Sequence, residues 1–172
     1  ALIAPEKLEV NEGTLTDRYG KFVCQPLERG FATTIGNSLR RVMLSSIRGA
    51  AITSVRLNDA LHEFTTIDGV HEDVAEIILN LKQVRLKLNG PESRTVVVEK
   101  TGPGRVTAGD INGGGYVEVM NPEQEICTIT AEVPFRAELE VQWGKGYVPA
   151  DQNKREGQPI GVIPVDSAFS PI

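Results

Sequence analysis

Two histidines and several acidic residues between positions 59 and 73 are the part of this sequence best suited to acid–base or metal chemistry. The candidates are Asp59, His62, Glu63, Asp68 and His71. On a strand, His62 and Glu63 would face opposite sides and could not exchange a proton directly. The spacing of the two histidines also differs from the HExxH pattern of a zinc-binding helix. A small metal-dependent hydrolase using residues 59–73 is therefore an alternative function, and a structural histidine explains the pattern as well.

Neither the glycine-rich strings nor the cysteines add a reactive site. GPGR at 102–105 and GKGY at 144–147 do not lead from a strand into a helix, as a phosphate cradle must, so turns are predicted at both. Cys24 and Cys127 form no CxxC motif, which predicts two buried thiols in a reducing compartment. The sequence thus predicts no catalytic residue, no metal and no cofactor in this chain.

The composition of the chain argues against direct binding to nucleic acid or to a membrane. The chain has 172 residues, 40% of them hydrophobic, and a formal net charge of -5, which argues against a surface that neutralises nucleic-acid phosphates. No run of about 18 apolar residues occurs, and the first ten residues lack the pattern of a signal peptide. We therefore predict a cytoplasmic protein in which this segment contacts neither nucleic acid nor membrane directly.

A helix at about 34–46 is the most strongly predicted element, with Thr33 or Thr34 as its N-cap. Its apolar positions recur at helical spacing and are Ile35, Leu39, Val42, Leu44 and Ile47. Such a helix must bury more than one face, and another chain would serve. Gly36 indicates either a close backbone approach or a tolerated glycine in the first turn.

Arg40 and Arg41 stand out on this helix because their neighbours are mostly apolar. Adjacent helical positions point about 100° apart, so one arginine should flank the apolar stripe while the other faces outward. A solvated charge is the simplest explanation of each. Arginine also suits bidentate pairing at an interface, and Leu44 lies about one turn away.

The rest of the sequence predicts an α+β fold with a β-rich second half. A second helix is expected at 72–84, where Glu72 and Asp73 suit the N-terminus and Lys82 lies in the last turn. A short extended piece is expected at 62–66, and an exposed loop at 146–161. Strands are expected at 15–26, 50–59, 84–90, 95–102, 116–122, 126–130, 137–143 and 161–166.

Four strings of this sequence resemble the N-terminal domain of the bacterial RNA polymerase alpha-subunit family. They are PLERGFATTIGNSLRRVMLSSIRGAAITSV, LHEFTTIDGVHEDVAEIILNLK, GKGYVPA and IPVDSAFSPI. The resemblance implies a dimerisation subdomain with a long helix, formed by residues 1–49 with 171–172 returning to it. An inserted β-rich subdomain would then cover residues 50–170. In this family the chain goes on past SPI to complete the dimerisation subdomain and to reach a DNA-binding C-terminal domain.

The same resemblance implies a non-catalytic assembly scaffold. Members of the family form a homodimer that recruits the beta and beta-prime subunits of DNA-directed RNA polymerase for DNA-templated transcription, with omega and sigma in the same complex. This complex is a nucleotidyltransferase, but its active site would lie outside this chain. A related assembly subunit of another polymerase lineage is a further alternative.

Carried over position by position, the resemblance implies three sets of docking residues. The dimer would form through Phe31, Ile35, Leu39 and Val42. The beta subunit would dock at Arg41 and Leu44, with His62, Glu63 and Phe64 nearby. The beta-prime subunit would dock at Lys82, Val165 and Asp166.

Overall fold

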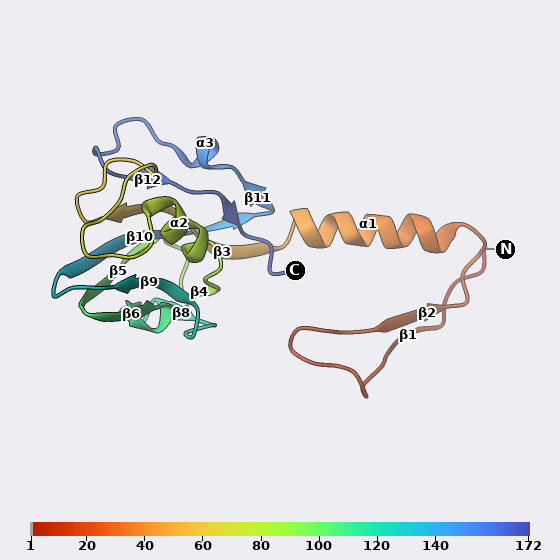
Figure 1. The fold of residues 1–172 in the computed structure, drawn as a ribbon. Coiled ribbons are helices and arrows are strands. Elements are labelled where there is room, and N and C mark those ends of the chain that lie inside the picture. The colour runs from red at the N-terminus through yellow and green to blue at the C-terminus, as the bar shows by residue number, and fades with distance from the viewer. Residues whose placement is uncertain (1) are drawn as a thin grey trace. The chain divides into compact units, whose positions relative to one another are not determined.

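The computed structural model describes residues 2–172 and divides them into two compact units, one ending at Met43 and the other covering Leu44–Ile172. The first unit contains an antiparallel hairpin and most of the first helix (Figure 1). Its elements are β1 (Lys7–Val10), β2 (Phe22–Gln25) and α1 (Phe31–Ser45), the last of which ends in the second unit.

The second unit is β-rich and carries two further α-helices and one 3₁₀ turn. The helical segments are α2 (Val74–Leu81), η1 (Ala108–Asp110) and α3 (Ala150–Asn153). The longer strands are β3 (Arg48–Leu57), β5 (Arg94–Thr101), β9 (Glu125–Ile129) and β10 (Pro134–Lys145). The shorter strands are β4 (Leu86–Leu88), β6 (Gly104–Thr107), β7 (Ile111–Asn112), β8 (Val117–Val119), β11 (Tyr147–Val148), β12 (Ile163–Pro164) and β13 (Ser167–Ala168). The α+β class is as predicted.

A seven-stranded antiparallel sheet forms the centre of this unit, in the order β7-β5-β10-β3-β4-β8, with β12 paired to β3 (Figure 1). Along β10 the buried positions are Phe135, Ala137, Leu139 and Val141, and they alternate with more exposed residues. This period of two places one face of the strand against the core. Each fully buried large side chain contributes about 1.5–3 kcal/mol, so the alternation along β10 is a main source of the unit's stability.

Helix α2 covers this core and begins at a capping box. Asp73 Oδ1 accepts the N–H of Glu76 at 2.8 Å, and Glu76 Oε2 accepts the N–H of Asp73 at 3.1 Å. The reciprocal bonds satisfy two donors that a helix N-terminus leaves unpaired. They explain why the predicted helix starts at Val74, and Lys82 forms its C-cap.

Two glycines allow the C-terminal segment to pack against the sheet. Gly49 and Gly144 are cross-strand partners in β3 and β10, and both lie against Phe169, which is buried. A Cβ on Gly49 would come within 1.9 Å of the Phe169 carbonyl oxygen, and one on Gly144 within 2.6 Å of its ring. The turn predicted for GKGY therefore begins only at Gly146, because Gly144 and Lys145 still belong to β10.

Helix α1 starts three residues earlier than expected. It begins at Phe31, directly after Gly30, which has a φ of +90°. The hydroxyl of Thr34 donates to the Gly30 carbonyl at 3.4 Å instead of accepting from the first turn, so the predicted threonine cap is wrong. In the described part of the chain, no atom from outside the helix lies within 4 Å of the point that a Cβ on Gly36 would occupy.

Two predicted extended segments are turns in the structure. The strand expected from Leu15 is limited to Phe22–Gln25, because the Thr16 hydroxyl accepts the N–H groups of Arg18 and Tyr19 and folds the preceding chain into a turn. Residues 62–66 form no strand, since the Phe64 N–H donates to His62 Nδ1 at 3.1 Å. The 146–161 loop contains β11 and α3.

The two cysteines differ in exposure. Cys127 is buried in β9 as predicted, and burial, together with the nearby Glu72 carboxylate, raises its pKa to about 12. Its thiol therefore stays protonated and unreactive. Cys24 is exposed on β2, so the prediction that it is buried is wrong within this chain.

No helix in residues 2–172 combines the length and apolarity needed to cross a bilayer. The border expected between residues 49 and 50, where the dimerisation subdomain would end and the inserted subdomain begin, stays a prediction.

Candidate docking surfaces

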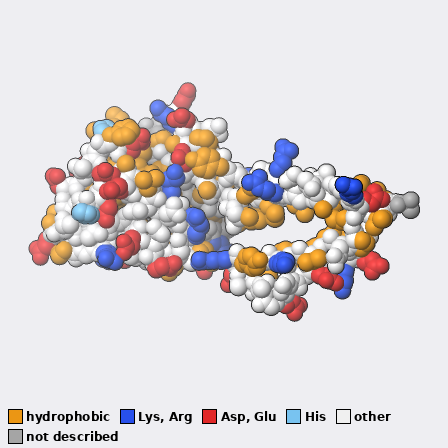
Figure 2. Space-filling view, turned by 45° about the vertical axis from the view of Figure 1, so that its right-hand side comes forward, with side chains coloured by type: hydrophobic (Ala, Val, Ile, Leu, Met, Phe, Trp, Pro, Cys, Tyr) orange, Lys and Arg blue, Asp and Glu red, His pale blue; other side chains and the backbone are white. Residues whose placement is uncertain are grey.

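Helix α1 is the most unusual element because it has 15 residues and none of them is buried. Its large exposed side chains are Phe31, Ile35, Leu39, Val42, Met43 and Leu44. Figure 2 shows hydrophobic side chains along this helix and along the hairpin of the same unit. An apolar helix surface of this size is energetically unfavourable in water and is typical of a protein contact.

The apolar residues of α1 fall on two faces. At roughly 100° per residue, Phe31, Ile35, Leu39 and Val42 fall within a stripe about 80° wide. Leu44 points about 180° from the centre of that stripe, and Arg41 lies about 60° from Leu44. The four predicted dimer residues thus share one face, and the two predicted beta-docking residues share another.

The end of α1 lies beside the turn between β10 and β11. A Cβ placed on Gly146 would come 3.7 Å from the Leu44 carbonyl oxygen and 3.6 Å from the Cα of Ser45. Gly146 has a φ of +64°, a conformation that favours glycine. Leu44 is therefore close to Tyr147, the residue that follows this turn.

The other predicted beta-docking residues, His62, Glu63 and Phe64, lie in the irregular segment between β3 and α2. Phe64 is 84% exposed, and its ring centroid lies 6.3 Å from that of His62. An aromatic side chain this exposed gains little from the fold of its own chain.

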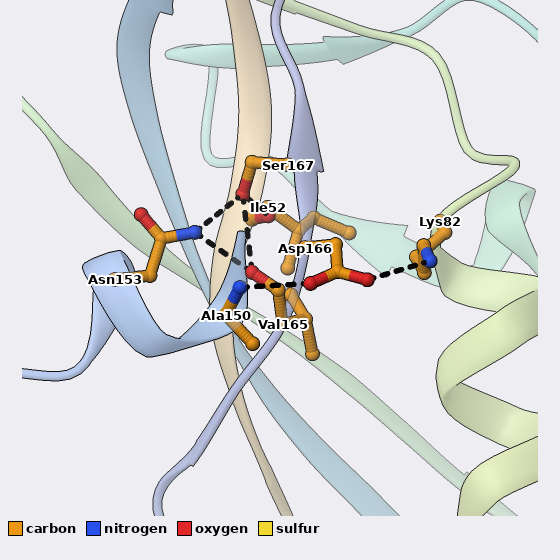
Figure 3. Close-up of polar contacts among 7 residues, drawn as sticks. All are labelled: Ile52, Lys82, Ala150, Asn153, Val165, Asp166 and Ser167. Atoms are coloured by element: carbon orange, nitrogen blue, oxygen red, sulfur yellow. Dashed lines mark hydrogen bonds and ion pairs between the residues drawn. The ribbon is translucent and has the colours of Figure 1, made fainter. Parts of the chain in front are cut away.

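The three predicted beta-prime residues meet at the end of α2 (Figure 3). Lys82 Nζ donates to Asp166 Oδ2 at 3.2 Å, and the Ala150 N–H donates to Asp166 Oδ1 at 2.7 Å. The Ala150 N–H, then Lys82, then the Tyr147 hydroxyl lower the pKa of Asp166 by stabilising its carboxylate. The ionised Asp166 carboxylate therefore lies beside the C-cap of α2 and beside residues of α3 and β11.

Val165 has a different position from its two predicted companions because it is only 3% exposed. Its carbonyl accepts from Asn153 Nδ2 at 2.7 Å, and the same amide donates to Ser167 Oγ at 2.9 Å (Figure 3). Ser167 Oγ in turn donates to the carbonyl of Ile52 at 2.6 Å. Val165 lies between β12 and β13 and is too buried to contact a partner directly in this chain, so its predicted docking role stays a prediction.

Tyr147, Ala150 and Asn153 were not among the predicted site residues. Tyr147 and Ala150 lie within the GKGYVPA string, which marked the region without giving individual roles. Their partners Asp166 and Ser167 are 14 to 19 residues away, so no local spacing could identify these contacts.

The residues of the alternative hydrolase do not converge in the described part of the chain. His62 lies in a turn, the backbone N–H of His71 donates to the Thr128 carbonyl at 2.9 Å, and Glu72 accepts from Thr128. Within residues 2–172, no group of three or more His, Cys, Asp or Glu side chains is placed to hold a metal ion.

Comparison with known proteins identifies the family of this chain. The family model described as the RNA polymerase Rpb3/RpoA insert domain matches residues 55–170, from within β3 to just after β13. The chain belongs to this family. Three curated relatives, each named DNA-directed RNA polymerase subunit alpha, extend the similarity to 99% of the chain. The chain is 58% identical to that of Desulfotalea psychrophila, 55% to that of Pelobacter propionicus and 53% to that of Geobacter metallireducens.

The chain spans about half the length of these curated relatives. Membership of the family is therefore clear for the β-rich unit and for the strings around it.

Proposed function

We propose that this chain is the assembly platform of a bacterial DNA-directed RNA polymerase. Two copies associate through the stripe formed by Phe31, Ile35, Leu39 and Val42. The dimer then recruits the beta subunit through Arg41, Leu44 and residues 62–64, and the beta-prime subunit through the Lys82–Asp166 surface. The reaction takes place in the recruited subunits.

The observation that carries this proposal is the complete exposure of α1. A helix with apolar side chains on two faces and no buried residue needs partners on both faces. A second copy suits the regular stripe, because a two-fold axis lets identical side chains meet. The face with Arg41 and Leu44 combines a cation with an apolar side chain, which suits a different protein.

The position of Leu44 beside Gly146 supports a dimer in which beta binds one protomer and beta-prime binds the other. A standard interface buries about 800 Å² on each partner, far more than the area around two neighbouring residues. A large subunit seated on Leu44 would therefore also cover Tyr147 and restrict access to the nearby Lys82–Asp166 surface. On this proposal, beta occupies one protomer and beta-prime the other.

The experiment that tests this proposal is a pull-down of isolated beta subunit by the full-length alpha subunit. Arg41→Ala should weaken beta recruitment by about 2 kcal/mol, because truncating a charged interface anchor leaves its partner groups unpaired. Circular dichroism and light scattering should show an unchanged fold and an unchanged dimer.

Arg40→Ala provides the matched control, since it removes the same charge from the neighbouring position of the same helix. It should change beta recruitment by less than about 0.5 kcal/mol. Equal losses for both variants would point to a general effect of charge, and normal recruitment by a folded Arg41→Ala dimer would contradict the assignment.

A further inference from the structure

The Lys82–Asp166 surface lacks an obvious anchor among the residues predicted for it. Val165 is buried, and the Asp166 carboxylate already accepts the Ala150 N–H on Oδ1 and Lys82 on Oδ2. Because both carboxylate oxygens of Asp166 already accept a hydrogen bond within this chain, they are less available to a partner's cation. Lys82 can still donate outward, because an ammonium group has three N–H donors and its bond to Asp166 uses one.

Tyr147 is the side chain of this cluster that projects furthest into solvent. It is 60% exposed, compared with 34% for the side chain of Asp166 and 29% for that of Lys82. The nearby Asp166 carboxylate raises the pKa of the Tyr147 hydroxyl, and the backbone of Tyr147 pairs with Ala168 in the ladder between β11 and β13. Gly146, packed against the end of α1, fixes the chain that leads into it.

We propose that Tyr147 is the aromatic anchor of the beta-prime docking surface. This inference rests on the proposed function, and it adds a contact residue that the predicted set did not contain. An exposed tyrosine ring on a paired strand offers a large contact area and loses little conformational entropy on binding, because its side chain has only two χ angles. The matching segment of the partner has an apolar side chain against the ring and a carbonyl or carboxylate oxygen that accepts from Lys82.

Two variants separate the ring from the hydroxyl. Full-length alpha subunit is assembled with beta, and the complex is titrated with purified beta-prime. Tyr147→Ala should weaken beta-prime binding at least tenfold while leaving the dimer unchanged. Tyr147→Phe keeps the ring and loses only the hydroxyl that helps to stabilise the Asp166 carboxylate, so it should stay within threefold of the wild type.

A threonine substitution serves if Tyr147→Ala fails to fold, because Tyr147→Thr removes the ring but suits a strand. Tyr116→Ala is the matched control: Tyr116 is also an exposed tyrosine of the β-rich unit, and it precedes β8. This control should leave beta-prime binding within twofold.

Lys82→Ala distinguishes failure of the inference from failure of the proposed function. If Lys82→Ala weakens beta-prime binding and Tyr147→Ala does not, the docking surface stands and the inference is overturned. If neither does, both are overturned. An equal loss for Tyr147→Phe and Tyr147→Ala would also overturn it, since Tyr147 would then act only by orienting Asp166.

Discussion

The two units of this chain differ in how far their apolar side chains are exposed to water. In residues 2–43, leucine, valine and phenylalanine side chains on the hairpin and on α1 are exposed or half-buried, and none is buried. From Ile52 onward the same residue types fill a continuous core under the central sheet. The β-rich unit therefore buries its apolar side chains in contacts of its own, while those of the first unit stay accessible to water within residues 2–172, as the proposed dimer would require.

The difference has a local explanation. The hairpin has only two strands, and its four cross-strand pairs leave both faces without a covering layer. The central sheet has seven strands, and α2 covers part of it. A pattern of apolar residues thus produces a core only where a second layer of the same chain covers it.

The largest expected effect contrasts two leucines. Leu139 is fully buried in β10, whereas Leu39 is 55% exposed on α1. Leu139→Ala should lower the free energy of unfolding by about 3 kcal/mol, because it leaves a cavity, and Leu39→Ala should change it by less than about 0.5 kcal/mol. Urea unfolding followed by the fluorescence of Trp143 measures the β-rich unit alone, since Trp143 lies in β10 and is the single tryptophan. Equal costs at both positions would remove the contrast between the units.

A charge placed on the apolar stripe of α1 tests whether this stripe forms the proposed contact between two copies of the chain. Ile35→Asp should weaken self-association of the full-length subunit by about 2–3 kcal/mol, because a carboxylate would lie unpaired in an apolar interface. The control Asn37→Asp adds the same charge to the same helix outside the stripe. Sedimentation equilibrium gives both dissociation constants, and a fully dimeric Ile35→Asp protein would exclude this stripe as the contact.

Two glycine-to-alanine changes should act in opposite directions. Gly49→Ala should destabilise the β-rich unit by about 2 kcal/mol, since the new methyl group meets the Phe169 backbone. Gly36→Ala should stabilise α1 by about 0.5–1 kcal/mol, because its methyl group meets no atom from outside the helix in the described chain and alanine favours a helix. Thermal unfolding tests the first change and helicity by circular dichroism the second. Weaker dimerisation of Gly36→Ala would indicate that a partner backbone approaches there.

The smallest effect concerns the ionised centre of the Lys82 surface. Because its pKa in the folded chain is lowered, Asp166 stabilises the fold fully above its ordinary pKa of about 4, and this contribution is lost as the pH falls through the folded value. Asp166→Asn should therefore unfold more easily than the wild type at pH 6, and the difference should shrink below about pH 4. Unfolding midpoints across this range measure it, with Asp151→Asn as the exposed control. A difference that persists unchanged at low pH would assign the effect to lost hydrogen bonds rather than to charge.

The sequence by itself determined the elements whose signals are local. Helical spacing predicted α1, alternation predicted most strands, and Glu72 and Asp73 marked the start of α2, because each of these depends on residues a few positions apart. The resemblance of four strings to the alpha-subunit family also needed only the order of residues. It brought Lys82 and Asp166 into one predicted site although they are 84 positions apart.

Only the tertiary structure decided which apolar residues are covered and which contacts complete each site. The exposure of Cys24 and the burial of Val165 depend on whether another part of the fold covers each side chain, which no local pattern records. The first turn of α1 was missed because the helix begins directly after Gly30, whose φ is +90°. The turn at residues 62–66 was missed because a single hydrogen bond from the Phe64 N–H to the His62 side chain shapes the backbone there. Tyr147 joined the Lys82 surface only because β11 pairs with β13, and pairing between distant strands depends on the whole sheet rather than on neighbouring residues.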